Sequence, residues 1–326
     1  MSSAPFIVVK DLVKHFPLKA GLFSRAAEKV HAVNGVSLAI ERGRTHGLVG
    51  ESGSGKTTTA RLLLRVIEPD SGSFSFGETP DVFALGPPEL KKLRRGMQYI
   101  FQDPYASLNP KMQIRGIVTE PLRYGEGSSR LSSRELDDTA AGLLERVGLS
   151  GSDIRKYPHE FSGGQRQRIC IARALSARPS FIVCDEPVSS LDVSIQSQIL
   201  NLLLDIQEET GISYLFIAHN LAVVFYLSDY VSVMYAGRIV EAGPSKVLSS
   251  RARHPYTRLL LAAMPGNRSA EGGAPPDSGE PPSLIRLPPG CAFYSRCPQR
   301  SQECAREVPP LEETESGHHS ACFRER

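Results

Sequence analysis

The residues best suited to chemistry form one short run, Gly50-Glu51-Ser52-Gly53-Ser54-Gly55-Lys56-Thr57. The run fits the phosphate-binding pattern G-x-x-x-x-G-K-[ST]. Its glycines let the backbone curl so that several N–H donors face one polyphosphate. Lys56 can then reach the β- and γ-phosphates, while the Thr57 hydroxyl can ligate Mg²⁺. The predicted phosphate contacts are Gly50, Glu51, Ser52, Gly53, Ser54, Gly55, Lys56, Thr57 and Thr58.

The context of this run supports the same interpretation. Apolar residues 47–49 predict the end of a strand, and residues 58–67 predict a helix whose N-terminus points at the phosphates. An ordinary glycine-rich turn is the alternative, but such an octapeptide rarely stands between a strand and a helix. The sequence therefore predicts a nucleotide site at this position.

Two carboxylates follow a second apolar run. Residues 181–184 are apolar without interruption, and Asp185 and Glu186 come directly after them. Continuous apolarity predicts a central parallel strand covered on both faces. Its carboxyl end lies at the edge where open α/β sheets bind ligands. Asp185 suits a Mg²⁺ shell there, and Glu186 suits the polarisation of water.

Two further polar residues stand directly after predicted strands. Gln102 follows the β-rich run 97–101, and His219 follows the buried run 212–218. In isolation Gln102 is equally compatible with the first polar residue of a loop, and a lone histidine is usually structural. At the carboxyl edge of the sheet, however, Gln102 can reach Mg²⁺ or the attacking water, and His219 gains a functional interpretation.

A second anion site is predicted where Ser162, Gly163, Gly164 and Gln165 precede a helical run at 166–177. Ser162 is a natural N-cap, and the two glycines leave the helix start unshielded. This site contains no lysine and no Mg²⁺ ligand. A third helix, at about 193–209, follows Ser189-Ser190-Leu191-Asp192.

Composition limits the classes of protein to which the chain can belong. The chain has 326 residues, 40% hydrophobic and 22% charged, which fits about two globular domains. A net charge of +3 is too small to argue for nucleic acid. No apolar run reaches the roughly 18 residues of a membrane span, and residues 1–5 carry no feature of a signal peptide. We expect an intracellular protein.

The remaining patterns predict an α/β core with additions. Runs 6–10 and 30–40 predict two antiparallel strands of a side sheet, in which Phe16 either stacks on adenine or belongs to the core. Residues 103–165 predict a helical insertion. Residues 230–235 and 238–241 predict a hairpin around Gly237, and residues 255–263 predict a helix.

Cysteines gather near the C-terminus. Cys170 and Cys184 sit singly in apolar runs and are expected in the core. Beyond a Pro/Gly/Ser/Glu-rich linker at 265–282, four more have the spacing C-x5-C-x6-C-x17-C, and four thiolates can hold Zn²⁺ or an iron–sulfur cluster. The absence of C-x2-C weakens the zinc-ribbon interpretation, and free or partly buried cysteines are the alternative. The four are Cys291, Cys297, Cys304 and Cys322.

Over residues 5–250 the chain resembles an ABC transporter ATPase. The resemblance rests on the order of these motifs: the phosphate loop, Gln102, the run 161–165, the pair 185–186, the run 189–192 and His219. Phe161 stands where the family's signature usually has Leu. Three further stretches resemble the oligopeptide/dipeptide importer branch, and the chain is similar to its second (F-type) ATPase. These stretches are 101–110, 157–161 and 254–257, together with the tail from Pro288-Pro289-Gly290-Cys291.

The resemblance implies a P-loop ABC nucleotide-binding fold with an antiparallel side sheet, a helical subdomain and a small Cys-rich extension. It implies an ATPase domain at 1–250 and a C-terminal region at 251–326. It assigns adenine stacking to Phe16, the general base to Glu186 and a γ-phosphate clamp to His219. It makes Gln102 a link from Mg²⁺ and the attacking water to the transmembrane subunits. Further expected nucleotide contacts are Ser162, Gly163, Gly164, Gln165 and Asp192, of which Ser162, Gly164 and Gln165 reach the γ-phosphate bound by a partner cassette.

The resemblance also implies partners and a cofactor. ATP and Mg²⁺ would be bound by a dimer of this chain with a related ATPase. The dimer would sit on two permease subunits at the cytoplasmic face of the membrane, and a substrate-binding protein would be an indirect partner. A [4Fe–4S] cluster is favoured over Zn²⁺ at the four cysteines. Nucleic acid is not an expected partner, because residues 291–326 hold five Arg and six Glu. A soluble ABC ATPase of translation or DNA repair is the alternative function.

Overall fold

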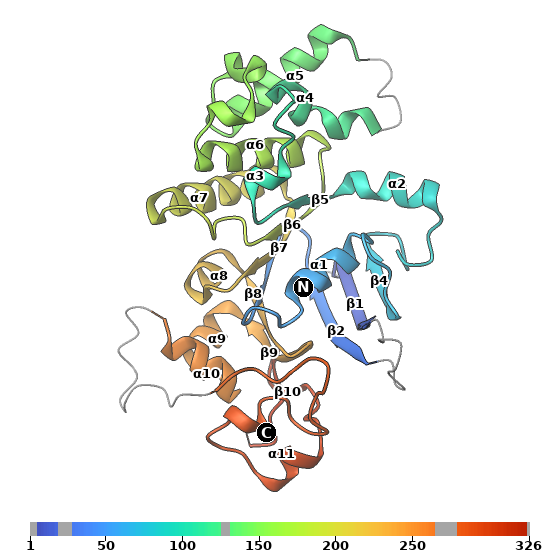
Figure 1. The fold of residues 1–326 in the computed structure, drawn as a ribbon, viewed down its shortest axis with the longest axis vertical. Helices are drawn as coiled ribbons and strands as arrows, with labels where there is room; N and C mark the ends of the chain where they lie inside the picture. The colour runs from blue at the N-terminus through green and yellow to red at the C-terminus, as the bar shows by residue number, and fades with distance from the viewer. Residues whose placement is uncertain (1–4, 19–27, 125–130, 265–278, 325–326) are drawn as a thin grey trace. The chain divides into compact units, whose positions relative to one another are not determined.

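A computed structural model describes residues 5–18, 28–124, 131–264 and 279–324. Most of the predicted linker at 265–282 therefore lies outside the described residues. The chain divides into two compact units, coloured by residue number in Figure 1. Unit 1 comprises residues 1–41, 45–83 and 217–326, and unit 2 comprises residues 42–44 and 84–216.

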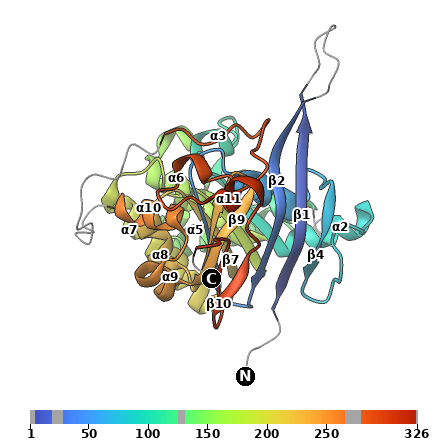
Figure 2. The same ribbon diagram turned by 90° about the horizontal axis from the view of Figure 1, so that it is seen from below.

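The predicted side sheet is present in unit 1 as a three-stranded antiparallel sheet of order β2-β1-β4 (Figure 2). β1 continues to Pro17, well past the predicted end at Lys10. The strand pairing resumes after a register shift at Asp11, whose φ is +50°. Ile7 and Leu12 are fully buried. The strands are β1 (Ile7–Pro17), β2 (Lys29–Ile40) and β4 (Ser71–Phe76).

The larger sheet contributes five strands to unit 1, in the order β10-β11-β9-β8-β3. β3 runs parallel to β8, whereas β8 and β9 form the predicted hairpin around Gly237, whose φ is +81°. The tail adds two short strands that the sequence did not predict, and β11 pairs with β9. These strands are β3 (Thr45–Val49), β8 (Tyr230–Tyr235), β9 (Arg238–Pro244), β10 (Glu312–Glu315) and β11 (His318–Ser320).

Short helices complete unit 1. The helix after the phosphate loop ends at Leu63, earlier than the predicted Ile67, because Arg65 has a φ of +50° that no α-helix continues through. The helix predicted at 255–263 is confirmed. The helices are α1 (Lys56–Leu63), α8 (Leu221–Leu227), α9 (Ser245–Arg251), α10 (Pro255–Ala262), η5 (Tyr294–Arg296) and α11 (Gln302–Arg306).

Unit 2 is built on the strand order β7-β6-β5, in which β5 and β6 are parallel. Every residue of β6 is buried, as its continuous apolarity predicts, and most of β7 belongs to this unit. The strands are β5 (Met97–Ile100), β6 (Phe181–Asp185) and β7 (Ser213–Ala218).

Helices α2 and α6 contact β5, and α4, α5 and α6 pack on one another. Ser132 and Glu135 form a capping box at the start of α5. Cys170 in α6 and Cys184 in β6 are fully buried, as predicted. The helices are α2 (Pro87–Gly96), α3 (Pro104–Ser107), α4 (Ile114–Val118), η1 (Glu120–Tyr124), α5 (Ser133–Arg146), η3 (Gly151–Arg155), η4 (Pro158–Glu160), α6 (Gly163–Ser176) and α7 (Val193–Thr210).

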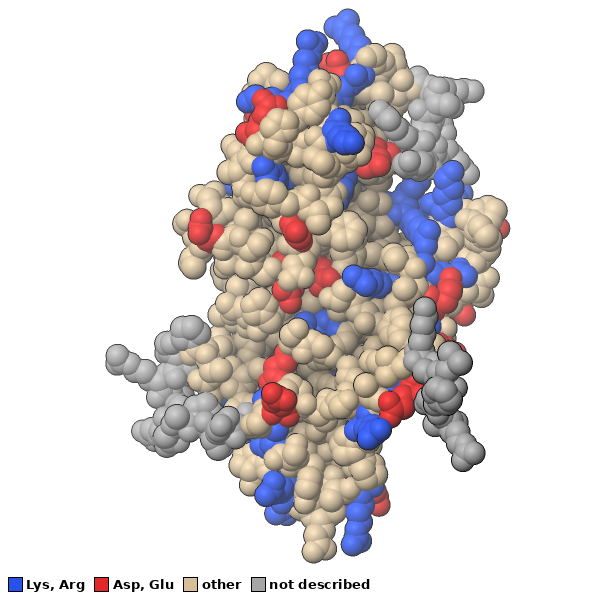
Figure 3. Space-filling view, viewed as in Figure 1, with Lys and Arg blue, Asp and Glu red and all other residues tan. Residues whose placement is uncertain are grey.

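Acidic and basic side chains are both spread over the face drawn in Figure 3. This mixture agrees with the small net charge of +3. Among the described residues, no helix combines the length and the apolarity that a membrane crossing requires.

The tail is fastened to the sheet by a fully buried carboxylate on β9. Glu241 accepts hydrogen bonds from the backbone N–H groups of Arg253 (2.6 Å) and His254 (3.1 Å), and its Oε1 lies 2.8 Å from Nε2 of His318 on β11. Because all three partners come from outside β9, Glu241 joins three stretches of unit 1.

We predict that Glu241→Ala lowers the free energy of unfolding by about 3 kcal/mol or more, because the hydrogen-bond donors that Glu241 accepts from would be left without an acceptor. Urea denaturation of the purified chain measures the change. The matched control is Glu307→Ala, which removes an exposed carboxylate and should cost less than about 0.5 kcal/mol. Equal losses in the two variants would contradict this role for Glu241.

Candidate nucleotide site

The phosphate-binding loop joins the fully buried strand β3 to helix α1. The loop is curled around one ammonium group, since Nζ of Lys56 donates to the carbonyl oxygens of Gly50 (2.7 Å) and Glu51 (2.8 Å). Lys56 is itself buried. The lysine that the sequence assigns to the phosphates therefore also holds the loop together.

Two glycines of the loop are required by their surroundings. A Cβ at Gly50 would lie 2.1 Å from the carbonyl oxygen of Met234, and a Cβ at Gly55 would lie 2.3 Å from that of Ala32. Gly55 also has a φ of +109°, which side chains rarely adopt. The loop thus packs against backbone so closely that only glycine fits at these positions.

Glu51 is held from outside the loop, which the sequence did not predict. Its N–H donates to the hydroxyl of Tyr256 (2.9 Å), and its carboxylate accepts two hydrogen bonds from Arg296 (2.9 Å each). Arg296 is almost entirely buried, and the Glu51 carboxylate raises the pKa of its guanidinium above the usual range. The only sequence signal for Arg296 was its place between Cys291 and Cys297.

A cavity of about 180 Å³ opens directly over the loop. Its walls come from the loop, from the turn after β8 and from a described stretch of the C-terminal region. The lining residues are Glu51, Ser52, Gly53, Ser54, Tyr235, Ala236, Pro281, Pro282 and Leu284.

In unit 2, the ends of β5 and β6 bring three predicted residues together. The Tyr99 hydroxyl donates to Oδ2 of buried Asp185 at 2.5 Å, and Nε2 of Gln102 donates to Oε2 of Glu186 at 2.8 Å. Glu186 has a φ of +47°, a strained conformation for a side chain of this size. Such strain gathers at functional sites because the surrounding contacts enforce it.

The predicted second anion site starts helix α6. The hydroxyl of Ser162 accepts from the N–H of Gln165 (3.3 Å), and Oε1 of Gln165 accepts from the N–H of Ser162 (2.9 Å). A Cβ at Gly164 would lie 2.5 Å from Ile195 of α7. Asp192 is the N-cap residue of α7. The capping box therefore fixes the helix start that the sequence assigns to a phosphate.

Two predicted nucleotide residues lie in unit 1 outside the loop. Phe16 on β1 is 37% exposed, so it is not the core residue of the alternative interpretation, and Nζ of Lys14 stands 5.6 Å from its ring centre. His219 is exposed directly after β7.

The four C-terminal cysteines line one small cavity in unit 1. The backbone N–H of Cys291 donates to the carbonyl of Cys304 (2.8 Å). Burial, and then the neighbouring thiols, raise the pKa of Cys291 to about 11. In the described part of the chain, however, no three His, Cys, Asp or Glu side chains are spaced to hold a metal ion.

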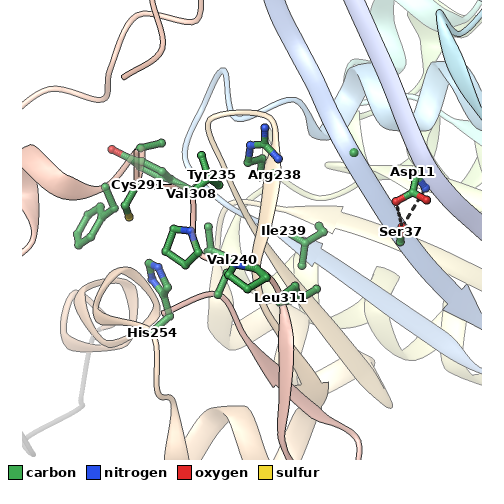
Figure 4. Close-up of a pocket in the computed structure, with 16 residues that line it drawn as sticks. Asp11, Ser37, Tyr235, Arg238, Ile239, Val240, His254, Cys291, Val308 and Leu311 are labelled. Carbon is green, nitrogen blue, oxygen red and sulfur yellow. Dashed lines mark hydrogen bonds between the residues drawn. The ribbon is translucent and has the colours of Figure 1, made fainter. Parts of the chain in front are cut away.

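A larger cavity of about 480 Å³ adjoins the cysteines (Figure 4). Cys291 and His254 lie along one side of this cavity, and Arg238 lies at the start of β9. Asp11 and Ser37 lie across from Cys291 and His254. Burial lowers the pKa of His254 to about 4, which leaves this imidazole neutral near pH 7.

Two family profiles match the chain. Residues 33–189 match the ABC transporter family, and residues 240–304 match the C-terminal region of oligopeptide/dipeptide transporters. The first match contains the phosphate loop, Gln102, Ser162 and the Asp185–Glu186 pair. The second contains Tyr256 and Arg296.

Curated relatives match over nearly the whole chain. The probable peptide ABC transporter ATP-binding protein y4tS of Sinorhizobium fredii is 48% identical over 99% of this chain and 90% of its own length. The oligopeptide transport ATP-binding protein AppF of Bacillus subtilis is 43% identical over 96% of this chain and 95% of its own.

Solved structures share the fold. A dimeric ATP-binding cassette in a post-hydrolysis state with ADP and Pi is 26% identical, with a TM-score of 0.63 over 73% of this chain and 98% of that one. The ADP conformation of an ABC transporter cassette has a TM-score of 0.64 over 80% of this chain and all of that one. The chain has the P-loop fold of an ABC ATPase, with its antiparallel β subdomain and its helical subdomain, and it belongs to the oligopeptide/dipeptide importer family of ABC transporter ATP-binding proteins.

Proposed function

We propose that this chain binds and hydrolyses ATP to drive an importer of di-/oligopeptides or related small solutes. The observation that carries the proposal is the near full-length similarity to ATP-binding proteins of peptide transport, joined to a match with their C-terminal region. The relatives described above are transport proteins, which favours import over translation or DNA repair.

We propose that Mg²⁺ binds with the ATP, on oxygen atoms offered by three residues. Thr57 offers a hydroxyl, Gln102 an amide oxygen and Asp185 a carboxylate, and hard oxygen donors are the ligands that Mg²⁺ prefers. When bound, the ion neutralises charge on the β- and γ-phosphates. Tyr99 keeps the Asp185 carboxylate oriented through its 2.5 Å hydrogen bond.

Hydrolysis then depends on where the chain places charge and water. Glu186 accepts a proton from the attacking water, whose oxygen bonds to the γ-phosphorus as the bond to the bridging oxygen of ADP breaks. Gln102 orients Glu186 through the 2.8 Å hydrogen bond between their side chains. Lys56 stabilises the growing charge, and His219 clamps the γ-phosphate. The products are ADP and phosphate.

We propose a split site formed by two cassettes. The loop at residues 50–58 and Phe16 hold one ATP, and the capped start of α6 on the partner covers its γ-phosphate. The similarity to a dimeric cassette with ADP and Pi supports this arrangement. The partner is a related ATPase, with this chain as the F-type member. Both ATPases would be peripheral to two permease subunits on the cytoplasmic face of the inner membrane, which receive solute from a binding protein.

For the domain limits we propose those expected from the sequence, an ATPase domain at 1–250 and a C-terminal region at 251–326. Within that region we propose that the four cysteines hold a [4Fe–4S] cluster, or Zn²⁺ as the alternative. All four line one cavity, which supports a shared ligand, but no three of them are spaced to hold a metal ion in this structure, so ligation would require the thiols to move closer together. The role would be structural, because a segment this small has little core of its own.

We predict that Glu186→Gln keeps ATP binding but lowers turnover about a hundredfold or more, because the amide cannot accept the proton. ATPase assays and size-exclusion chromatography with Mg-ATP measure turnover and a trapped dimer. The matched control is Glu208→Gln, an exposed position on α7. Turnover at the normal rate in Glu186→Gln would show that another group is the base.

We predict that Lys56→Ala weakens nucleotide binding itself, by about tenfold or more, because it removes the cation at the β- and γ-phosphates and loosens the loop. Titration with a fluorescent ATP analogue measures the Kd. Lys246→Ala, which removes an exposed lysine from α9, should bind as the unmodified chain does. Unchanged affinity in Lys56→Ala would contradict the assignment.

We predict that anaerobically purified protein carries iron and sulfide with visible thiolate-to-iron absorbance, and that Cys297→Ser loses both. Cys170→Ser, a buried cysteine of α6, is the control that should keep them. Elemental analysis gives the metal. A colourless protein with one zinc per chain would exclude the cluster, and a metal-free folded protein would exclude both.

A further inference from the structure

All three polar parts of one loop residue, Glu51, are engaged. Its carbonyl oxygen accepts from Lys56 inside the loop, its N–H donates to Tyr256, and its carboxylate accepts two bonds from Arg296. Two of these three attachments come from the C-terminal region, at distances of 205 and 245 residues along the chain. The phosphate-binding loop is therefore anchored to a region outside the family's ATPase match.

The Arg296–Glu51 pair differs from a surface ion pair. The Arg296 side chain is 7% exposed and that of Glu51 is 28% exposed. A planar guanidinium that meets a carboxylate through two hydrogen bonds fixes orientation as well as distance. Since the pair is mostly removed from water, its loss leaves a charge poorly compensated.

Arg296 is itself positioned by aromatic packing. Its guanidinium carbon lies 5.5 Å from the ring centre of Phe293 and 5.7 Å from that of Tyr235, and the hydroxyl of Tyr235 accepts from Nη1 (3.3 Å). Tyr235 also packs on Tyr256, with ring centres 4.5 Å apart. Tyr256 and Arg296, which both form hydrogen bonds with Glu51, thus belong to one packed cluster, and the arrangement of this cluster positions both of them.

We propose that Arg296 is a positioning residue for nucleotide, which holds Glu51 and so sets the conformation and the charge of the phosphate-binding loop. With Arg296 in place, the charge of the Glu51 carboxylate is paired and its orientation is fixed by two hydrogen bonds. Without it, a mobile carboxylate stands in a loop that must receive a polyanion. This inference rests on the proposed nucleotide function and adds the C-terminal region to the binding site.

A consequence is reciprocal coupling between nucleotide and the segment 291–297. If this segment raises the affinity of the loop for ATP, bound ATP must stabilise the segment by the same factor.

The first test uses the full chain. We expect Arg296→Gln to raise the Kd for a fluorescent ATP analogue about tenfold, while turnover at saturating ATP changes less than about twofold. Arg296→Lys keeps the positive charge but loses the planar guanidinium that makes two hydrogen bonds to one carboxylate, so its Kd should rise less. Adding Glu51→Gln to Arg296→Gln should restore much of the affinity, because it removes the unpaired carboxylate.

The matched control is Arg286→Gln. Arg286 also joins the C-terminal region to the sheet through hydrogen bonds to one carboxylate, Glu28, but its side chain is 83% exposed and the pair does not include the loop. Its removal should leave the Kd unchanged. A rise equal to that of Arg296→Gln would overturn the proposal. Unchanged affinity in folded Arg296→Gln would overturn it too, as would a double variant whose Kd stays as high as that of Arg296→Gln.

The second test needs no substitution. We expect the ATP analogue to slow amide hydrogen exchange across residues 291–297 in the unmodified chain, and to leave exchange at Glu28 and Arg286 unchanged. Unaltered exchange at 291–297 would overturn the coupling even if Arg296→Gln fails to fold. Failure of the nucleotide function is recognised separately, because the unmodified chain would then not bind the analogue at all.

Discussion

A loop that binds polyphosphate must keep several backbone N–H groups available, and this constraint governs the structure around residues 50–57. Backbone groups are normally stabilised by pairing with one another, so such a loop needs other contacts to hold its shape. Here β3 and α1 fix its ends, and Lys56 ties the carbonyls of Gly50 and Glu51 from within. Close packing on Met234 and Ala32 then excludes any side chain larger than hydrogen at two positions.

The same need for fixed polar groups explains the ends of β5 and β6. Asp185 is buried, yet its carboxylate has a hydroxyl partner in Tyr99. Glu186 adopts a strained backbone, and it is held on both sides, by Gln102 at its carboxylate and by Ser189 at its carbonyl oxygen. A carboxylate held in this way has a fixed orientation before any ligand arrives.

The sequence predicted those features that depend on short stretches of chain. The phosphate loop, the buried strand before Asp185, the hairpin around Gly237 and the capped start at Ser162 each carry a local pattern of glycine, apolar or capping residues. The end of α1 was missed because the left-handed Arg65 has no such signal.

Features that depend on contacts between distant residues were not predicted, for a different reason. The strand at Glu312–Glu315 is polar throughout and shows no alternation, so it exists only because β11 pairs with the edge of β9. The contacts of Tyr256 and Arg296 with Glu51 join residues more than two hundred positions apart. No periodicity links such residues, and only the folded chain brings them together.

The strength of the Arg296 contact limits what the C-terminal region can do to the nucleotide site. Hydrogen bonds to charged groups contribute about 1.5–3 kcal/mol each, and a coupling of about 1–3 kcal/mol corresponds to about a 5- to 150-fold change in affinity. On the proposed role of Arg296, the contact would therefore tune ATP affinity over this range without acting as an absolute switch. Because the aromatic cluster of Tyr235, Tyr256 and Phe293 packs around Arg296, any ligand or bond that repacks this cluster would reach the phosphate-binding loop through Glu51, at both its backbone N–H and its carboxylate.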